Sequence, residues 1–429
     1  MDIQAIHSLF LTCHSLSIDT RKIGDNALFV ALKGDNFDAN TFAAEALTKG
    51  ASYVIIDNKD YYIDERTILV DNSLEALQEL ARFHRTYLGL PIIALTGSNG
   101  KTTTKELINV VLSKKYNVKA TVGNLNNHIG VPLTLLSFDA STEIGIVEMG
   151  ANHQKEIEFL CTIATPDFGY ITNFGKAHLE GFGGIEGVIK GKSEMYDYLA
   201  QQDKVVFVNL DDGLQHSKTK AMHRFTFGYR NPEAGISIHD IQTTPLVSIT
   251  FNHTTVNSHL IGLYNANNIN AAITIGHYFN INDTEIKDAI EHYTPTNNRS
   301  QLIRKNTNEI ILDAYNANPS SMKAAIENFI QLQQANKMMI LGDMFELGAE
   351  SLQEHRNIID LLIDNKEILV YFVGHDFYSQ KISQPHFKFF STFESVSEAL
   401  KAHIITNHFI LVKGSRGMAL ERCLQLLPE

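Results

Sequence analysis

A glycine-rich segment at residues 96–103 sets the strictest limit on how this chain folds. It reads TGSNGKTT and stands between the apolar stretch PIIALTG and the amphipathic stretch KTTTKELINVVLSKK. A loop of this kind turns backbone N–H groups and the positive end of a helix toward phosphate groups. Its spacing, GxxGKT, is about two residues shorter than the common GxxxxGKT. Because strand, loop, Lys-Thr pair and helix occur in register, we predict a phosphate-binding loop rather than a turn that merely starts a helix.

Apolar runs typical of strands alternate with helix-like runs along most of the 429 residues. This alternation is typical of parallel sheets with crossover helices. The length indicates two to three domains at about 150 residues each, and the pattern breaks at LGLPI and at TPTNNRSQ. We therefore predict an α/β fold with three domains: a small α/β domain at 1–88, a central P-loop parallel-sheet domain at 89–297, and a C-terminal Rossmann-like α/β domain at 298–429. A last helix is expected after the strand HFILVKG.

Charge and cysteine usage exclude several classes of protein. The chain has 36 Lys and Arg against 48 Asp and Glu, a net charge of −12, which disfavours a protein that coats nucleic acid or anionic membrane. It has neither an apolar run of membrane-spanning length nor an N-terminus that resembles a signal peptide, so we expect a cytoplasmic protein. Cys13, Cys161 and Cys423 are far apart and without CxxC spacing, which indicates structural thiols.

Two residues at predicted strand ends are candidates to hold a metal ion. Glu148 ends the strand EIGIVEMG, and His178 follows the strand FGYITNFG. Ligands collect beyond the carboxyl ends of parallel strands, so both residues are expected near the phosphate loop. Alternatively, the Glu caps a helix and the His is structural. The chain lacks HExxH, GxSxG and CxxC motifs, which leaves phosphoryl transfer as the favoured chemistry.

With these motifs in place, the chain resembles the Mur ligase family over essentially all three predicted domains. The resemblance rests on many ordered segments besides TGSNGKTT: IDTRKIGDNALFVALKG with FDAN, GNLNNHIGVPLTLL, EMGANHQKEIE, TNFGKAHLEGFG, GKSEMY, GLYNANNINAAI, DAYNANPSSM, LGDMFELG and LVKGSRGMALE. It implies a substrate-binding N-terminal domain, a central ATPase domain and a C-terminal domain that holds the acceptor and closes over ATP.

Within the family, DAYNANPSSM and LGDMFELG resemble the members that add D-alanyl-D-alanine to UDP-N-acetylmuramoyl-tripeptide. The resemblance implies that ATP phosphorylates the terminal carboxylate of the tripeptide and that the dipeptide amine attacks the acyl phosphate. The products would be ADP, phosphate and the UDP-muramoyl-pentapeptide precursor of peptidoglycan. The alternatives are the related ligase that adds lysine or diaminopimelate to the dipeptide precursor, a P-loop small-molecule kinase, and a catalytically silent precursor-binding protein.

The resemblance also implies roles for residues around ATP and its metal ions. The ATP phosphates would be bound by Gly97, Ser98, Asn99, Gly100, Lys101, Thr102 and Thr103. Thr102 and Glu148 would hold one Mg²⁺, and His178 would help to hold a second. Lys192, in GKSEMY, matches the lysine that the family carbamylates, since a carbamate offers a metal ion an anionic oxygen where an ammonium repels it. Lys190 is the nearby competitor for this role.

Further roles extend over the other two domains. Asn265 would approach adenine, Arg299 the terminal phosphate and Asp313 the ribose. The residues expected to be catalytic are Lys101, Lys192, His178 and Arg299. The UDP-muramoyl group would be bound by Thr20, Arg21 and Lys33. Residues expected at the cleft and acceptor are Asn316, Asn318, Lys413, Ser415 and Arg416. Because the predicted ATP contacts straddle the second boundary, we expect the domains to close around both substrates; a monomer is expected, and the third residue of the substrate peptide stays open.

Overall fold

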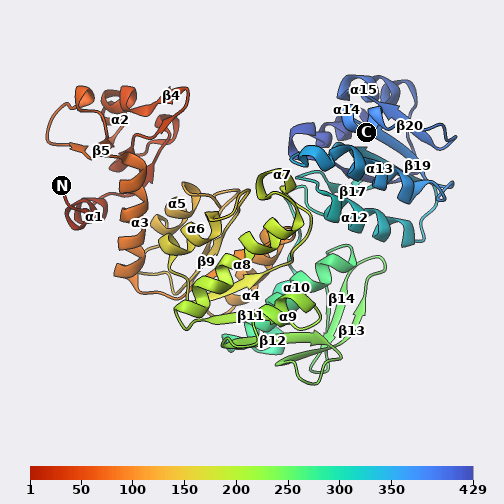
Figure 1. Ribbon diagram of the computed structural model, residues 1–429, viewed down its shortest axis with the longest axis horizontal. Coiled ribbons are helices and arrows are strands. Elements are labelled where there is room, and N and C mark those ends of the chain that lie inside the picture. The colour runs from red at the N-terminus through yellow and green to blue at the C-terminus, as the bar shows by residue number, and fades with distance from the viewer. Residues whose placement is uncertain (429) are drawn as a thin grey trace.

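Three lobes make up the computed structural model, which describes residues 1–428 (Figure 1). The strands of the three main sheets lie within residues 15–69, 92–257 and 301–413. Figure 1 places the N-terminal and C-terminal lobes on opposite sides of the central lobe. Every helix within residues 1–428 is too short or too polar to cross a membrane. The predicted three-domain α/β class is confirmed, while the exact boundaries after residues 88 and 297 stay predictions.

The N-terminal lobe is built on a parallel sheet of order β1-β2-β5-β6. Its elements are α1 (Ile3–Phe10), β1 (Ser15–Ser17), β2 (Ala27–Val30), β3 (Lys33–Gly34), β4 (Phe37–Asp38), α2 (Ala43–Thr48), β5 (Ala51–Ile56), β6 (Thr67–Leu69) and α3 (Ser73–Leu88). Helix α3 packs against α1 and also against α5 and α6 of the central lobe. It therefore joins the two lobes through packed side chains and not only through the chain.

The central lobe carries a nine-stranded sheet of order β15-β14-β13-β12-β11-β10-β7-β9-β8. Strands β7 to β13 run parallel, and β14 and β15 extend the sheet antiparallel. Its elements are β7 (Ile92–Thr96), α4 (Lys101–Leu112), β8 (Val118–Ala120), α5 (Gly130–Leu136), β9 (Ile144–Glu148), α6 (Glu156–Ala164), β10 (Phe168–Ile171), α7 (Leu179–Phe182), α8 (Ile185–Gln201), β11 (Val205–Asn209), α9 (Gly213–Lys218), β12 (Arg224–Tyr229), β13 (Ile236–Gln242), β14 (Ser248–Phe251), β15 (Thr254–Asn257), α10 (Leu263–Tyr278) and α11 (Asp283–Glu291). Every residue of β7 and β9 is buried, as expected for strands covered on both faces.

The C-terminal lobe has a six-stranded sheet of order β16-β17-β21-β18-β19-β20, parallel except at the β16 edge. Its elements are β16 (Gln301–Lys305), β17 (Asn308–Asp313), α12 (Pro319–Gln331), β18 (Lys337–Gly342), α13 (Ser351–Leu362), β19 (Leu369–Val373), α14 (His375–Ser379), β20 (Phe387–Phe390), α15 (Phe393–Ala402) and β21 (Phe409–Lys413). The expected last helix is present in 3₁₀ form and in two pieces, Arg416–Met418 and Leu420–Leu426. They are separated by Ala419, whose left-handed backbone (φ 46°) interrupts a continuous α-helix.

Sheet order determines where the phosphate loop lies. Strand β7 pairs with β10 on one side and β9 on the other, all parallel. The loop follows β7, Glu148 ends β9, and the segment with His178 follows β10. Their carboxyl ends share one edge of the sheet, where ligands of open α/β sheets bind.

A buried histidine pair makes the stability of the N-terminal lobe dependent on pH. His84 Nε2 donates to the carbonyl of Phe138 (2.9 Å), so its Nδ1 accepts from His7 Nε2 (3.0 Å). Burial and the neighbouring His84 lower the pKa of His7 to about 4. Between about pH 6.5 and 4, His7 therefore binds a proton more readily in the unfolded chain than in the folded chain. The free energy of unfolding falls as the pH drops through that window. We expect the urea midpoint to fall less between pH 7 and 5 in His7→Gln than in the unmodified chain; equal falls would contradict this.

Candidate active site

The phosphate loop turns at two glycines that no other residue can replace without movement. Gly97 and Gly100 have φ values of 139° and 82°. A Cβ on Gly97 would lie 2.0 Å from Thr172 Oγ1, and one on Gly100 would lie 2.5 Å from Asn268 Oδ1. Helix α4 starts at Lys101, directly after the loop, so the unpaired N–H groups of its first turn lie at the loop. This geometry provides an anion-binding site.

Lys101 brings a positive charge into this loop. Its Nζ donates to the carbonyl of Gly97 (2.6 Å). Burial lowers the pKa of Lys101; Glu148 opposes this effect and the positive charge of Arg299 adds to it. The ammonium of Lys101 and the guanidinium of Arg299 lie near enough to repel each other. Two such neighbouring cations are suited to binding a polyphosphate anion.

The end of β9 supplies oxygen atoms that fit a Mg²⁺ ion. Glu148 is 2% exposed; its Oε2 accepts from Thr102 Oγ1 (2.9 Å) and its Oε1 from Asn126 Nδ2 (2.9 Å). Among residues 1–428, no basic side chain forms an ion pair with this carboxylate. A buried carboxylate without a paired cation, next to a hydroxyl, is a donor set of the kind that hard divalent cations prefer.

His178 lies between β10 and α7 in a left-handed conformation, with φ 51°. Its Nδ1 contacts the carboxylate of Glu346 in the C-terminal lobe. The imidazole lines the same cavity as Glu148. The structure therefore brings both strand-end candidates, Glu148 and His178, to one cavity, which Thr102 also lines.

Lys192 and Lys190 differ sharply although both lie on α8. Lys192 is 1% exposed, its Nζ donates to the carbonyl of Ala151 (3.1 Å), and it lies 5.0 Å from the centroid of the Phe182 ring. Burial, together with the charge of Lys101, holds the pKa of Lys192 well below its usual range. Lys190 is exposed. A buried lysine with a lowered pKa is a nucleophilic amine, which is the form that reacts with CO₂.

Helix α10 presents amide side chains to the loop. Asn265 Nδ2 donates to the carbonyl of Ile261 (2.8 Å), and its Oδ1 accepts from Asn268 Nδ2 (2.8 Å). Asn268 Oδ1 in turn accepts from Thr104 Oγ1 on α4 (3.0 Å). The predicted adenine contact, Asn265, is thus held in register with the phosphate loop.

The junction between the central and C-terminal lobes places an arginine at the cavity. The guanidinium of Arg299 lies 3.5 Å from the centroid of the Tyr315 ring. Asp313 accepts from the Ser300 N–H (3.1 Å) and from Lys413 Nζ (2.6 Å). Stacking leaves the N–H edge of a guanidinium free for hydrogen bonds, so Arg299 is placed to bind an anion.

The C-terminal lobe touches the phosphate loop directly. Asn318 Nδ2, at the start of α12, donates to Asn99 Oδ1 (2.7 Å). Asn316 Oδ1 accepts from the Arg416 N–H (3.3 Å), and Ser415 Oγ donates to the carbonyl of Ala317 (3.2 Å). Ser415 and Arg416 thus shape the loop that bears Asn316 and Asn318.

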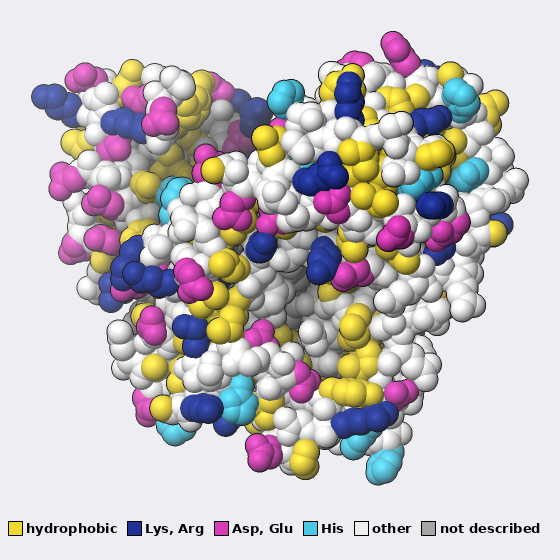
Figure 2. Space-filling view, turned by 45° about the vertical axis from the view of Figure 1, so that its right-hand side comes forward, with side chains coloured by type: hydrophobic (Ala, Val, Ile, Leu, Met, Phe, Trp, Pro, Cys, Tyr) yellow, Lys and Arg dark blue, Asp and Glu magenta, His cyan; other side chains and the backbone are white. Residues whose placement is uncertain are grey.

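One cavity of about 850 Å³ collects most of the predicted site. The predicted residues that line it are Ser98, Asn99, Gly100, Lys101, Thr102, Thr103, Glu148, His178, Asn265, Arg299, Asp313, Asn316, Asn318 and Lys413. Figure 2 shows the surface hollowed in the middle of the molecule, with Lys and Arg side chains at the edge. The predicted residues that do not line it are Gly97, Lys192, Ser415, Arg416, Thr20, Arg21 and Lys33.

The three residues predicted to bind UDP lie in the N-terminal lobe. Thr20 and Arg21 form a 3₁₀ turn after Asp19, which pairs with Arg21 (2.9 Å). Lys33, on β3, pairs with Asp57 (2.8 Å). Arg21 and Lys33 are therefore exposed cations with local carboxylate partners, and their role toward UDP stays a prediction.

Sequence reasoning missed three amides of the site. Asn126 holds Glu148, Asn268 holds Asn265, and Asn173 Oδ1 accepts from the Asn99 N–H (3.2 Å). Asn126 and Asn268 stand in the segments GNLNNHIG and GLYNANNINAAI. Their asparagine-rich composition was the available signal, but several asparagines compete in each segment.

Comparison with known proteins identifies the family. Three family models match the chain. Residues 12–85 match the model "Mur ligase family, catalytic domain", residues 95–276 match "Mur ligase middle domain", and residues 298–416 match "Mur ligase, glutamate ligase domain". A Bacillus subtilis protein named UDP-N-acetylmuramoyl-tripeptide--D-alanyl-D-alanine ligase is 34% identical, over 97% of this chain and 93% of its own length. The chain belongs to the Mur ligase family.

Solved structures of Mur ligases agree with this assignment. A structure titled MurF from Acinetobacter baumannii matches with a TM-score of 0.86 at 29% identity, covering 98% of each chain. The MurF ligase from Thermotoga maritima in complex with ADP matches with a TM-score of 0.84 at 26% identity, covering 97% of each chain. The resemblance predicted from the motifs is therefore confirmed.

Proposed function

We propose that this Mur ligase uses ATP to join D-alanyl-D-alanine to UDP-N-acetylmuramoyl-tripeptide, a step of peptidoglycan synthesis. One observation carries the proposal: a single cavity is lined by the phosphate loop, by the buried carboxylate of Glu148, and by Asn316 and Asn318 of the C-terminal lobe. Such a cavity can hold a nucleotide on one wall and an acceptor on the other. The relatives named for this reaction supply the substrate identities.

The chemistry requires an activated carboxylate. A free carboxylate is a poor acylating agent, and transfer of the ATP γ-phosphoryl group to its oxygen creates a phosphate leaving group. The dipeptide amine then forms the amide bond, and the C–O bond to phosphate breaks. Both substrates must lie together away from water, because the acyl phosphate would otherwise hydrolyse. An interdomain cavity that closes over both substrates would meet that requirement.

The chain supplies the positive charge that phosphoryl transfer needs. Lys101 and Arg299 are placed to neutralise charge on the transferred group, and Asn265 and Asp313 to orient adenine and ribose. Thr102 with Glu148, and His178 with carbamylated Lys192, would hold two Mg²⁺ ions. When bound, such ions withdraw charge from phosphate oxygens. Thr20, Arg21 and Lys33 would bind the UDP-muramoyl group, and Lys413, Ser415 and Arg416 would support the acceptor side.

Product analysis tests the substrate assignment. We expect phosphate release only when ATP, Mg²⁺, UDP-muramoyl-tripeptide and D-alanyl-D-alanine are all present, with a product heavier by one dipeptide residue, that is, the dipeptide less one water. Turnover with UDP-muramoyl-dipeptide plus lysine or diaminopimelate would instead assign the preceding step. A stable phosphorylated product would indicate a kinase, and no turnover with any substrate would indicate a binding protein. Parallel assays with lysine- and diaminopimelate-containing tripeptides identify the third peptide residue.

Domain closure gives a second expectation. The contacts of Asn99 with Asn318 and of His178 with Glu346 cross between the central and C-terminal lobes, so bound nucleotide and tripeptide should favour compact molecules. We expect the radius of gyration from X-ray scattering to fall when a non-hydrolysable ATP analogue and the tripeptide substrate are added. An unchanged radius would contradict closure. The same scattering curves report the mass, for which we expect a monomer.

A further inference from the structure

The C-terminal lobe contacts a predicted metal ligand of the central lobe through one acidic side chain. Glu346 pairs with Nδ1 of His178, and its carbonyl accepts from the Glu180 N–H (3.3 Å). Both residues of this contact are non-glycine residues with left-handed backbones, Glu346 at φ 62° and His178 at φ 51°. Such conformations persist where the surrounding structure holds them in place, and they concentrate at functional sites.

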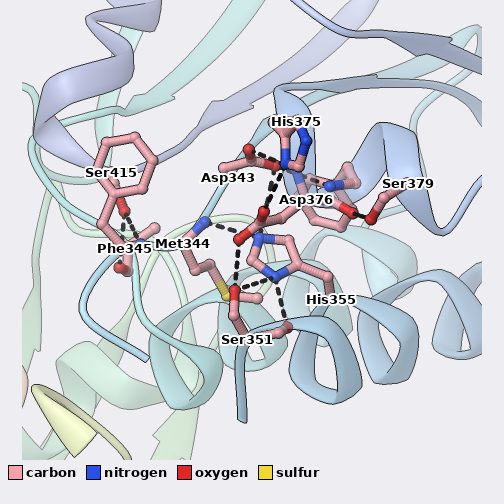
Figure 3. A network of polar contacts seen from close by, with 11 residues as sticks. Asp343, Met344, Phe345, Ser351, His355, His375, Asp376, Ser379 and Ser415 are labelled. Carbon is pink, nitrogen blue, oxygen red and sulfur yellow. Dashed lines mark hydrogen bonds and ion pairs between the residues drawn. The ribbon is translucent and has the colours of Figure 1, made fainter. Parts of the chain in front are cut away.

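The loop that carries Glu346 is held by hydrogen bonds on both sides (Figure 3). Phe345 N–H donates to Ser415 Oγ (2.8 Å), and Met344 N–H donates to His355 Nε2 (3.0 Å). Asp343 accepts from the N–H groups of Asp376 and Phe377 at the start of α14 (2.9 and 3.0 Å). The position of Glu346 is thus fixed relative to the C-terminal sheet.

The cluster behind this loop supports it and is itself unsuited to a metal ion. Asp343, His355 and Asp376 lie close enough to share an ion. However, His355 Nε2 accepts from a backbone N–H, and its Nδ1 donates to the carbonyl of Ser351 (2.7 Å). Both ring nitrogens are therefore occupied, and both Asp343 oxygens accept from backbone N–H groups. The cluster is a buried support for the loop.

The pairing with Glu346 selects one tautomer of His178. A carboxylate can only accept, so Nδ1 carries the proton and Nε2 keeps its lone pair. Within residues 1–428, the imidazole of His178 has no polar partner other than the Glu346 carboxylate, which lies at Nδ1. A histidine whose second nitrogen donates to a carboxylate is oriented and made more basic as a metal ligand.

We propose that Glu346 is a positioning residue, which orients His178 for the second metal ion only when the C-terminal lobe is docked. This inference rests on the proposed function, in which His178 serves a metal ion. The Glu346 side chain is 53% exposed, so the pair contributes little to stability. The contact between Glu346 and His178 instead makes the orientation of the His178 imidazole depend on docking of the C-terminal lobe.

Mn²⁺ binding to the ADP complex of the full chain, followed by electron paramagnetic resonance, tests this role without turnover. We expect Glu346→Ala to weaken one class of Mn²⁺ sites by about 10–100-fold and to leave the class at Thr102 and Glu148 unchanged. Glu346→Gln keeps an oxygen acceptor and should recover part of the loss. The matched control is Glu354→Ala, which removes another ion pair between the same lobes, with Lys176, and should bind Mn²⁺ normally.

A second readout examines His178 directly. In ¹⁵N-histidine spectra, with His178→Gln used for assignment, we expect the proton on Nδ1 in the unmodified chain and a mixture of tautomers in Glu346→Ala. Unchanged Mn²⁺ binding in Glu346→Ala, equal losses in Glu346→Ala and Glu354→Ala, or a proton on Nε2 in the unmodified chain would each overturn the proposal. Neither readout needs the peptide substrates, so absence of ligase turnover would refute the proposed function separately.

Discussion

Replacing Lys192 by Ala is expected to reduce phosphate release by about 10²–10³-fold, the scale of losing one preorganised polar group from an active site. Adding a short carboxylic acid such as acetate should restore part of the rate, because its oxygen atoms can occupy the space of the proposed carbamate. The structural reason is the burial of Lys192: it is 1% exposed and its only hydrogen bond within residues 1–428 is to the carbonyl of Ala151. Steady-state assays with and without acetate measure both effects.

The matched control for this variant is Lys190→Ala. Lys190 lies on the same helix but is exposed, so its loss should change the rate less than about twofold. Full activity of Lys192→Ala would contradict the assignment, and a large loss in Lys190→Ala would transfer the role to that residue. Mass spectrometry in the presence of bicarbonate would show whether the carbamate forms on Lys192.

Replacing Glu148 by Gln is expected to lower the rate of Mg²⁺-dependent phosphate release by about 10²–10³-fold or more. The folded protein should be equally stable or more stable. Glu148 is a buried carboxylate that accepts from Thr102 and Asn126. It forms no direct ion pair, and the attraction of the nearby Lys101 and Lys105 offsets only part of the cost of burying its charge. Removing that charge while keeping the shape of the side chain relieves the cost but removes the proposed Mg²⁺ ligand, a trade between stability and activity.

Thermal denaturation in EDTA and Mg²⁺-dependent turnover measure the two halves of this prediction. Glu143→Gln is the control, because Glu143 is exposed just before the same strand. A Glu148→Gln protein that is clearly less stable would contradict the view that the cost of burying this charge exceeds its attraction to Lys101 and Lys105. One that keeps full Mg²⁺-dependent activity would contradict the metal assignment.

Much of the site could be predicted because its signals are local in sequence. Gly97, Gly100, Lys101 and Thr102 stand in one short segment between β7 and the first turn of α4. Strand β7 and its neighbours in the sheet, β9 and β10, are apolar runs. Glu148 and His178 were placed at the same edge because parallel strands end there. These predictions need only the parallel direction of the strands, which the alternation of strands and helices supplies; the order β10-β7-β9 comes from the structure.

Other features could not be predicted because they depend on segments that meet only in the folded chain. Asn126 reaches Glu148 across 22 positions, and Glu346 reaches His178 from another lobe. The last segment shows a different limit: Leu420, Cys423 and Leu427 are buried at a spacing that fits α and 3₁₀ turns alike. In so short a segment, packing rather than helix propagation decides between them.

The central claim, ligation through an acyl phosphate, is tested most directly by isotope transfer. The terminal carboxylate of the UDP-muramoyl-tripeptide is labelled with ¹⁸O, and the inorganic phosphate released in the presence of ATP, Mg²⁺ and D-alanyl-D-alanine is analysed by mass spectrometry. We predict that each phosphate released carries one oxygen from the tripeptide, together with formation of the pentapeptide product. Phosphate free of ¹⁸O would show that the carboxylate is never phosphorylated and would contradict the proposed mechanism.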